Sequence, residues 1–146
     1  MLVWVAAWFA FTPAVHACTP PALVVPDGLT GAEVRLRSAD AAIYGVVSSV
    51  RVLESPPVSG PPLPNFGHRF EAKVRVSRVF KGMTGRVVRV RGNTSGATCG
   101  IGELRVRQRL GLLLNGPSRP YQVSISSRIT LRELLRATRG KWRRPA

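Results

Sequence analysis

The chain has 146 residues, 45% of them hydrophobic, and its 22 Lys and Arg against 7 Asp and Glu give a formal net charge of +15. This length holds one domain and excludes a second, while 14 Gly and 12 Pro favour a turn-rich β architecture over long helices. Such a charge would attract nucleic acid, anionic envelope polymers or acidic membranes, with little specificity and strong salt dependence. The alternative explanation is that the whole proteome is rich in arginine codons, so that arginines occupy solvated surface positions without a binding role.

An apolar run opens the chain. Residues Leu2–Phe11 are almost unbroken apolar, and Val15-His16-Ala17 has small residues where signal peptidase reads, so we predict a signal peptide over 1–17. The run is too short to span a bilayer. No Lys or Arg precedes it, and a buried N-terminal strand is the alternative. A leader would make the protein secreted or extracytoplasmic.

The predicted mature chain begins with one of its two cysteines, Cys18, and the other is Cys99. Export would let the two thiols oxidise to the one intramolecular disulfide that the chain allows. On the chain-entropy model, closing a loop of about 80 residues stabilises a fold by about 4 kcal/mol. A competing explanation is a lipoprotein in which a diacylglycerol occupies the sulfur of Cys18, and such a protein could not form the bridge.

Two helices are predicted from their N-terminal signals. Thr30 and Glu33 have the S/T-x-x-E spacing of a capping box, which predicts a short helix ending near Ala39. Thr130 and Glu133 repeat the spacing and predict a second helix. A basic tail over 141–146 follows it.

Five strands are predicted from runs of β-branched residues and from alternating apolar residues. They cover residues 41–53, 70–76, 86–91, 104–114 and 121–125. A Pro-rich loop at 55–67 and a Gly-rich polar loop at 92–100 separate some of them. Five strands and two short helices in one domain are typical of a mainly β fold, a five-stranded Greek-key barrel of the OB type.

Candidate catalytic residues are few. His68 is the only histidine outside the predicted leader, and it has no cysteine or second histidine nearby in the sequence, which indicates an ordinary surface residue. The acidic residues are scattered, with no pair set by spacing: Asp27, Glu33, Asp40, Glu54, Glu71, Glu103 and Glu133. No phosphate-binding loop motif is present. We therefore expect a protein that is not an enzyme and needs no cofactor or metal.

In order and spacing, the chain resembles the netrin-like domain of the tissue inhibitors of metalloproteinases and their short bacterial relatives. The resemblance is carried by Cys18-Thr19-Pro20-Pro21, by Ser38-Ala39-Asp40-Ala41-Ala42-Ile43-Tyr44-Gly45-Val46-Val47, by Val76-Ser77-Arg78-Val79-Phe80-Lys81-Gly82 and by Thr98-Cys99-Gly100. It covers most of residues 18–135. The family's second N-terminal cysteine has no counterpart here, and Ser126 and Ser127 occupy the place of a later cysteine.

This resemblance implies an inhibitor of a zinc metalloprotease. The α-amine and carbonyl of a mature Cys18 would occupy the open position of the protease's zinc, which normally holds water, and Thr19 would enter its specificity pocket. A bridge to Cys99 would keep this N-terminal wedge, Cys18 and Thr19, rigid and so lower the entropy lost on binding. The alternative role of Cys18 is a structural staple alone, because a fold does not transfer a function.

A rival hypothesis uses the basic residues as a binding face for anionic polymers. Six arginines lie on predicted neighbouring strands, mostly with a common parity: Arg86, Arg89, Arg91, Arg105, Arg107 and Arg109. Because single-strand nucleic-acid binders add stacking aromatics to such a face, and aromatics are few here, an anionic glycan or envelope polymer is the better partner.

Together these inferences predict a signal peptide over 1–17, a netrin-like OB-fold domain over 18–140 and a basic tail over 141–146. The predicted function is a secreted, non-catalytic binding module that inhibits a zinc metalloprotease, or else binds anionic polymers through a basic face. We predict neither a specific nucleic-acid partner nor a transmembrane segment.

Overall fold

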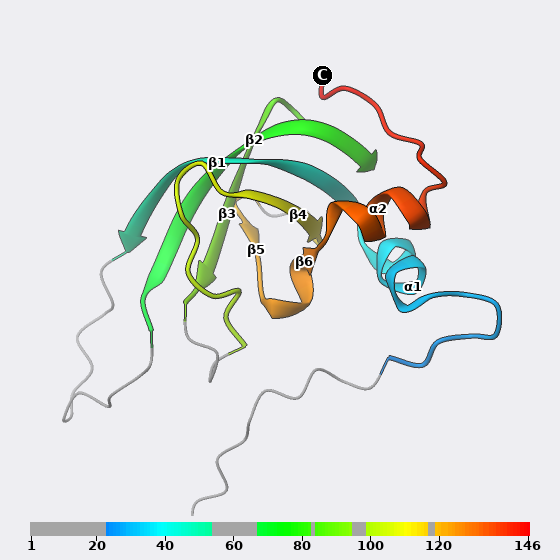
Figure 1. Ribbon diagram of the computed structural model, residues 1–146. Helices are drawn as coiled ribbons and strands as arrows, with labels where there is room; N and C mark the ends of the chain where they lie inside the picture. Colours follow the sequence, from blue (N-terminus) through cyan, green and yellow to red (C-terminus); the bar gives the residue numbers. More distant parts are fainter. Residues whose placement is uncertain (1–22, 54–66, 83, 95–98, 117–118) are drawn as a thin grey trace, which may run out of the picture.

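The computed structural model describes residues 23–53, 67–82, 84–94, 99–116 and 119–146 (Figure 1). It has one strongly curled sheet of six strands, with two α-helices at one end, so the mainly β class and the two helices are confirmed. The elements in chain order are α1 (Gly31–Ser38), β1 (Ala41–Leu53), β2 (Arg69–Lys81), β3 (Val87–Asn93), β4 (Arg109–Leu114), β5 (Tyr121–Gln122), the 3₁₀ helix η2 (Ile125–Ser127), β6 (Arg128–Ile129) and α2 (Leu131–Ala137).

Both helices begin at the predicted capping boxes. At the start of α1, Glu33 N donates to Thr30 Oγ1 over 3.3 Å and Thr30 N donates to Glu33 Oε2 over 2.7 Å. At the start of α2, the same reciprocal pair joins Thr130 and Glu133, with distances of 3.2 and 2.8 Å. Each box satisfies amide groups that have no partner within the helix, which is why such short helices form here.

The strand order in the sheet is β5-β3-β2-β1-β4-β6, with β1 covering the predicted 41–53. The pairs β1–β2, β2–β3, β1–β4 and β4–β6 are antiparallel, whereas β3 and β5 are parallel. The two edge strands, β5 and β6, are consecutive in the chain. Residues 123–127 therefore carry the chain from one edge of the curled sheet to the other.

The predicted five-stranded barrel is found only in part, because the described strands form a curled, open sheet of six. The predicted strand 121–125 bonds β3 only as far as the Val123 amide, which donates to Arg91 O, and then turns into η2. Ser127 Oγ accepts from Ser124 N over 3.1 Å, and Ser127 N donates to Ser124 O over 2.9 Å. Serine side chains that bond the local backbone compete with a sheet ladder, and pairing resumes only at β6.

The predicted strand 104–114 is also too long, since β4 begins at Arg109. Before it lies a turn in which Gln108 N donates to Arg105 O over 3.0 Å and Arg105 N donates to the Gln108 side chain over 2.9 Å. Arg107 has a left-handed backbone, with φ of 71°. Leu104 is nevertheless buried. The apolar residue that suggested an early start of the strand therefore belongs to a loop that folds over the end of the core.

The core has two parts, one on each side of the sheet. The inner part fills the concave side with alternate strand residues, among them Ile43, Phe70, Val74 and Leu112. The outer part lies under the helices and consists of Leu36, Ala39, Ala42, Leu113, Ile129 and Leu134. The start of β1 and most of β4 are thus buried on both faces, which explains their continuous apolar sequence.

Gly111 allows β6 to pack onto β4. A Cβ atom at this position would lie 2.4 Å from the carbonyl oxygen of Ile129 and 3.0 Å from the Leu134 side chain. Only glycine therefore permits the close approach of this edge and of α2.

The predicted tail over 141–146 contacts the sheet. Arg143 forms an isolated antiparallel bridge with Val79 of β2, with both hydrogen bonds at 2.9 Å. The Arg143 side chain also donates to Gly82 O, and the Arg78 guanidinium lies 4.8 Å from the centre of the Trp142 ring. The tail thus covers the part of β2 that extends beyond its pairing with β3.

Candidate functional site: a basic face on strands β1 to β3

The outer face of β1, β2 and β3 is lined with cationic side chains. Directly paired residues in an antiparallel sheet lie on the same face. Glu71 of β2 pairs with Arg51 of β1 and Arg91 of β3, and Lys73 pairs with Arg89. We define the basic face by its six cations, Arg51, Arg69, Lys73, Arg75, Arg89 and Arg91, which all lie on this side of the sheet.

The inner core sets this orientation. On β2, Phe70, Ala72 and Val74 are buried in the concave side. Because side chains alternate along a strand, the intervening positions of β2 must point outward. The charges therefore line the convex surface as a consequence of which residues are apolar.

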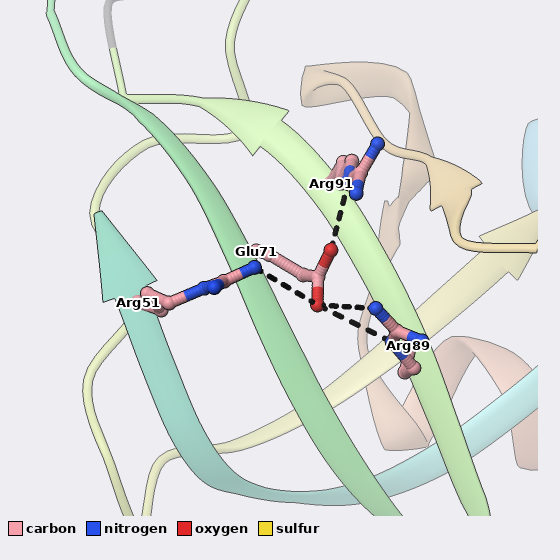
Figure 2. Close-up of polar contacts among 4 residues, drawn as sticks. All are labelled: Arg51, Glu71, Arg89 and Arg91. Atoms are coloured by element: carbon pink, nitrogen blue, oxygen red, sulfur yellow. Dashed lines mark hydrogen bonds and ion pairs between the residues drawn. The ribbon is translucent and has the colours of Figure 1, made fainter. Parts of the chain in front are cut away.

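Glu71 is the centre of the basic face (Figure 2). Arg89 donates to Glu71 Oε1 from Nε over 3.2 Å and from Nη2 over 2.8 Å, while Arg91 Nε donates to Oε2 over 2.8 Å. Arg51 Nη2 lies 3.8 Å from Oε1, on the opposite side of the carboxylate. The three arginines cover Glu71, which is only 7% exposed.

The surrounding arginines stabilise the ionised form of Glu71. Hydrogen bonds from Arg89 and then from Arg91 hold the pKa of this carboxyl below its ordinary value. The carboxylate in turn fixes the orientation of the guanidinium groups, so a ligand would find them already ordered. Glu71 is the only acidic residue on β1, β2 or β3, and the face stays strongly cationic.

The structure does not bring the six predicted arginines together. Arg89 and Arg91 belong to the basic face, but Arg109 starts β4, and β1 and β2 lie between β3 and β4. Arg105 and Arg107 lie in the turn before β4, and Arg86 precedes β3. The assumption that these strands are neighbours was wrong, because parity along a strand does not reveal which strands pair.

Four members of the basic face were not predicted as site residues: Arg51, Arg69, Lys73 and Arg75. The alternation of Phe70 to Val76 with charged residues was visible in the sequence. This alternation indicated a half-buried strand, and the charged residues on its exposed side were the signal that could have identified Arg69, Lys73 and Arg75 as site residues.

Cys18 and Thr19 lie outside the described residues, so the predicted bridge and the predicted zinc-binding wedge stay predictions. Cys99 is half-buried and is not a free thiol. Its backbone is left-handed, with φ of 55°, and its carbonyl accepts from Ile125 N over 3.1 Å. It lines a cleft of about 270 Å³ together with Arg91 and Ser124, next to the basic face.

His68 is exposed and takes part in a backbone pairing. Its N–H donates to Thr94 Oγ1 over 2.7 Å, and its carbonyl accepts from Thr94 N over 3.0 Å. Within the described ranges, no three His, Cys, Asp or Glu residues come together as a group that could hold a metal ion. Nor, in that part of the chain, is any helix long and apolar enough to cross a membrane.

Comparisons with known proteins give no family for this chain: no family model matches the sequence, and no curated protein matches it. The resemblance to the netrin-like domain stays a prediction from the residues.

Proposed function

We propose that the protein is a secreted, non-catalytic binding module that holds an anionic glycan or envelope polymer on the basic face. The observation that carries this proposal is the gathering of six cations on one face of three adjacent strands, with a single carboxylate among them that three of the arginines contact. An extended cationic surface of this kind concentrates polyanions and makes their binding dependent on salt.

The spacing of the cations suits a polymer better than a small anion. Outward-facing residues on one strand are about 6.6 Å apart, and neighbouring strands are about 4.8 Å apart. A chain with repeated carboxylate or sulfate groups can contact several such cations at once. The outward positions paired around Glu71 carry Arg, Lys, Glu, Ser, Val, Leu and Asn, with no aromatic side chain on which a nucleic-acid base could stack. The one aromatic residue on β1, Tyr44, lies further along the outer face, so we favour a glycan.

The test is retention on immobilised heparin in a salt gradient. A Lys73→Gln/Arg75→Gln variant should elute at lower salt than the unaltered protein, and the slope of log K against log salt should fall by about 2, one for each lost contact. The control is Arg132→Gln/Arg136→Gln, which removes the same charge from the exposed side of α2. An equal loss of retention in the control would show attraction by net charge alone and would reject the proposal.

The strand order supports assigning the fold to the OB type. The strands β1, β2 and β3 form a meander, β4 lies beside β1, and the segment 121–129 contacts β3 at one end and β4 at the other. In this assignment, β5 and β6 are the two halves of an interrupted fifth strand. The open sheet agrees with a partly open barrel.

We also propose inhibition of a zinc metalloprotease as a second function, in line with the netrin-like resemblance. The inhibitory mechanism needs a bridge from Cys18 to Cys99, and Cys99 is not a free thiol, a condition that a purely structural bridge would also meet. The test compares a mature form beginning at Cys18 with one that carries an additional N-terminal Ala. Chelation requires inhibition by the first form and a large loss in the second, since the added residue displaces the α-amine from the zinc. Equal potency of the two forms, or none in either, would reject chelation.

A further inference from the structure

An open cleft of about 610 Å³ lies beside the basic face, between β4, β6 and the two helices. Its polar lining consists mainly of Arg35, Gln108, Arg109, Arg128 and Glu133, and Tyr44 adds an aromatic surface. The volume is in the range of sites for small ligands or single sugar units. No role was predicted for Arg35, Tyr44, Gln108 or Arg128.

The cleft is held in shape by contacts within the fold. Arg35 Nη2 donates to Ser126 O over 2.7 Å and also to Arg128 O, which attaches α1 to β6. Tyr44 pairs with Gly111 across β1 and β4, and it is half-buried. These contacts make the cleft a preformed site, so little ordering is needed when a ligand binds.

The charge of the cleft is positive despite Glu133. This carboxylate accepts from Thr130 N over 2.8 Å and from Thr130 Oγ1 over 2.6 Å, as part of the capping box of α2. The Arg109 side chain is exposed at the cleft. Arg128 pairs with Leu112 of the inner core, so its side chain lies on the other face of the sheet, and its carbonyl oxygen, which accepts from Arg35, faces the cleft. Guanidinium groups suit carboxylates and sulfates, which they can bind through two parallel hydrogen bonds.

The cleft is continuous with the basic face. Val46 of β1 pairs with Arg75 of β2 on one side and with Arg109 of β4 on the other. All three residues therefore lie in one row on the same face of the sheet. Arg75 ends the basic face, and Arg109 begins the lining of the cleft.

We propose that the cleft binds one carboxylate- or sulfate-bearing sugar unit of the polymer whose neighbouring units lie on the basic face. Arg109 binds the anionic group, Gln108 hydrogen-bonds sugar hydroxyls, and the Tyr44 ring supplies the apolar surface. This inference rests on the proposed function and adds to it a position and a ligand chemistry. The polymer would run from the row of Arg89 and Lys73, past Arg75, into the cleft.

The test is an NMR titration of the full chain with a heparin-derived hexasaccharide. Backbone amide signals of Lys73 and Arg89 report on the basic face, and those of Gly111 and Thr130 report on the cleft. The proposal requires both sets to shift with one affinity. Shifts on the basic face alone would overturn the cleft proposal and leave the proposed function standing, whereas shifts at the cleft alone would overturn the basic face as the main site. No shift in either set would overturn both.

Matched variants separate a site from general attraction. Arg109→Gln should abolish the shifts at Gly111 and weaken the binding of the hexasaccharide about tenfold, because a bidentate charge-assisted contact is lost. The shifts at Lys73 should remain. Arg132→Gln, with the same charge, should leave both sets unchanged, and an equal loss in this control would overturn the proposal. Tighter binding at the cleft by a single-stranded oligonucleotide of equal charge would overturn the choice of a sugar.

Discussion

Glu71 has the most unusual environment of any acidic side chain that the structure describes. It lies in the middle of the outward face of β2, with Arg89 and Arg91 hydrogen-bonded to its two oxygens. An uncovered carboxylate at this position would face solvent, whereas the arginines bury it and lower its pKa. One residue of β2 thus orders arginines of the two neighbouring strands, β1 and β3, and moderates their repulsion.

We predict that Glu71→Gln lowers the stability at neutral pH. The pKa of Glu71 is lower in the folded protein than its ordinary value, so its stabilising contribution is complete above the ordinary value and is lost as the pH falls through the folded one. The difference in melting temperature between the unaltered protein and the variant should therefore be largest near neutral pH and should disappear in acid. Circular dichroism melts over this pH range measure it.

Glu103→Gln is the control for this experiment. The Glu103–Arg105 ion pair spans 3.3 Å, but its side chains are 69% and 80% exposed. Exposed pairs contribute little to stability, so this variant should melt like the unaltered protein at every pH. A Glu71→Gln deficit that stays constant into acid would contradict the ionised Glu71 as its source.

At the level of elements, the outer core explains how two short helices are held. Leu134 of α2 is fully buried against β4 and β6, near Leu113 and Ile129. Arg35 of α1 donates to the carbonyl of Arg128 in β6. Packing and capping together compensate for helices that are too short to be stable alone.

We predict that Leu134→Ala destabilises the protein by about 3 kcal/mol, since it removes buried methyl groups and leaves a cavity. Urea denaturation with an unchanged m-value would measure this loss. Leu135→Ala is the matched control, because Leu135 is only partly buried, and it should cost clearly less. Equal losses in the two variants would contradict the orientation of α2.

The C-terminal segment gives a second prediction at this level. Val79 N donates to Arg143 O over 2.9 Å, so deletion of residues 141–146 should accelerate hydrogen exchange at the Val79 amide about tenfold or more. The amide of Val123, which donates to Arg91 O at the opposite side of the sheet, should keep its protection. Unchanged exchange at Val79 would show that the tail does not cover this edge in solution.

At the scale of the whole molecule, the sheet is open, yet consecutive residues connect its two edges. Pairing with β3 ends at Gln122 and pairing with β4 begins at Arg128, and the carbonyl of Cys99 accepts from Ile125 N in between. The loop that carries Cys99 therefore contacts the segment that spans the opening. A covalent link at Cys99 would restrict this loop.

We predict that the exported protein begins at Cys18 and contains a Cys18–Cys99 disulfide. Its mass should be two hydrogens below that of the reduced chain, and reduction should lower its stability by about 4 kcal/mol, the value expected for closing a loop of about 80 residues. A Cys18→Ser/Cys99→Ser variant should have the stability of the reduced form and should not respond to reductant. A diacylglyceryl adduct on Cys18 would reject the disulfide.

Much of the local structure could be predicted because its signals are local. The capping boxes at Thr30 and Thr130 specified both helix starts, and the β-branched run specified β1. The interruption between β5 and β6 was missed because it depends on serine hydroxyls that bond the backbone, a choice between two hydrogen-bond patterns that the apolar alternation does not encode. The early part of the predicted strand 104–114 failed for a similar reason, since a buried Leu104 fits a loop as well as a strand.

The sequence by itself determined the mainly β class, the position of both helices and the excess of positive charge, because propensity, capping and composition act over a few residues. The tertiary structure decided which charges meet. Strand order separates Arg109 from β3, joins Arg51 to Glu71 and Arg91, and places Val46 between Arg75 and Arg109. Such neighbours are set by pairing between distant segments, which residue periodicity does not specify.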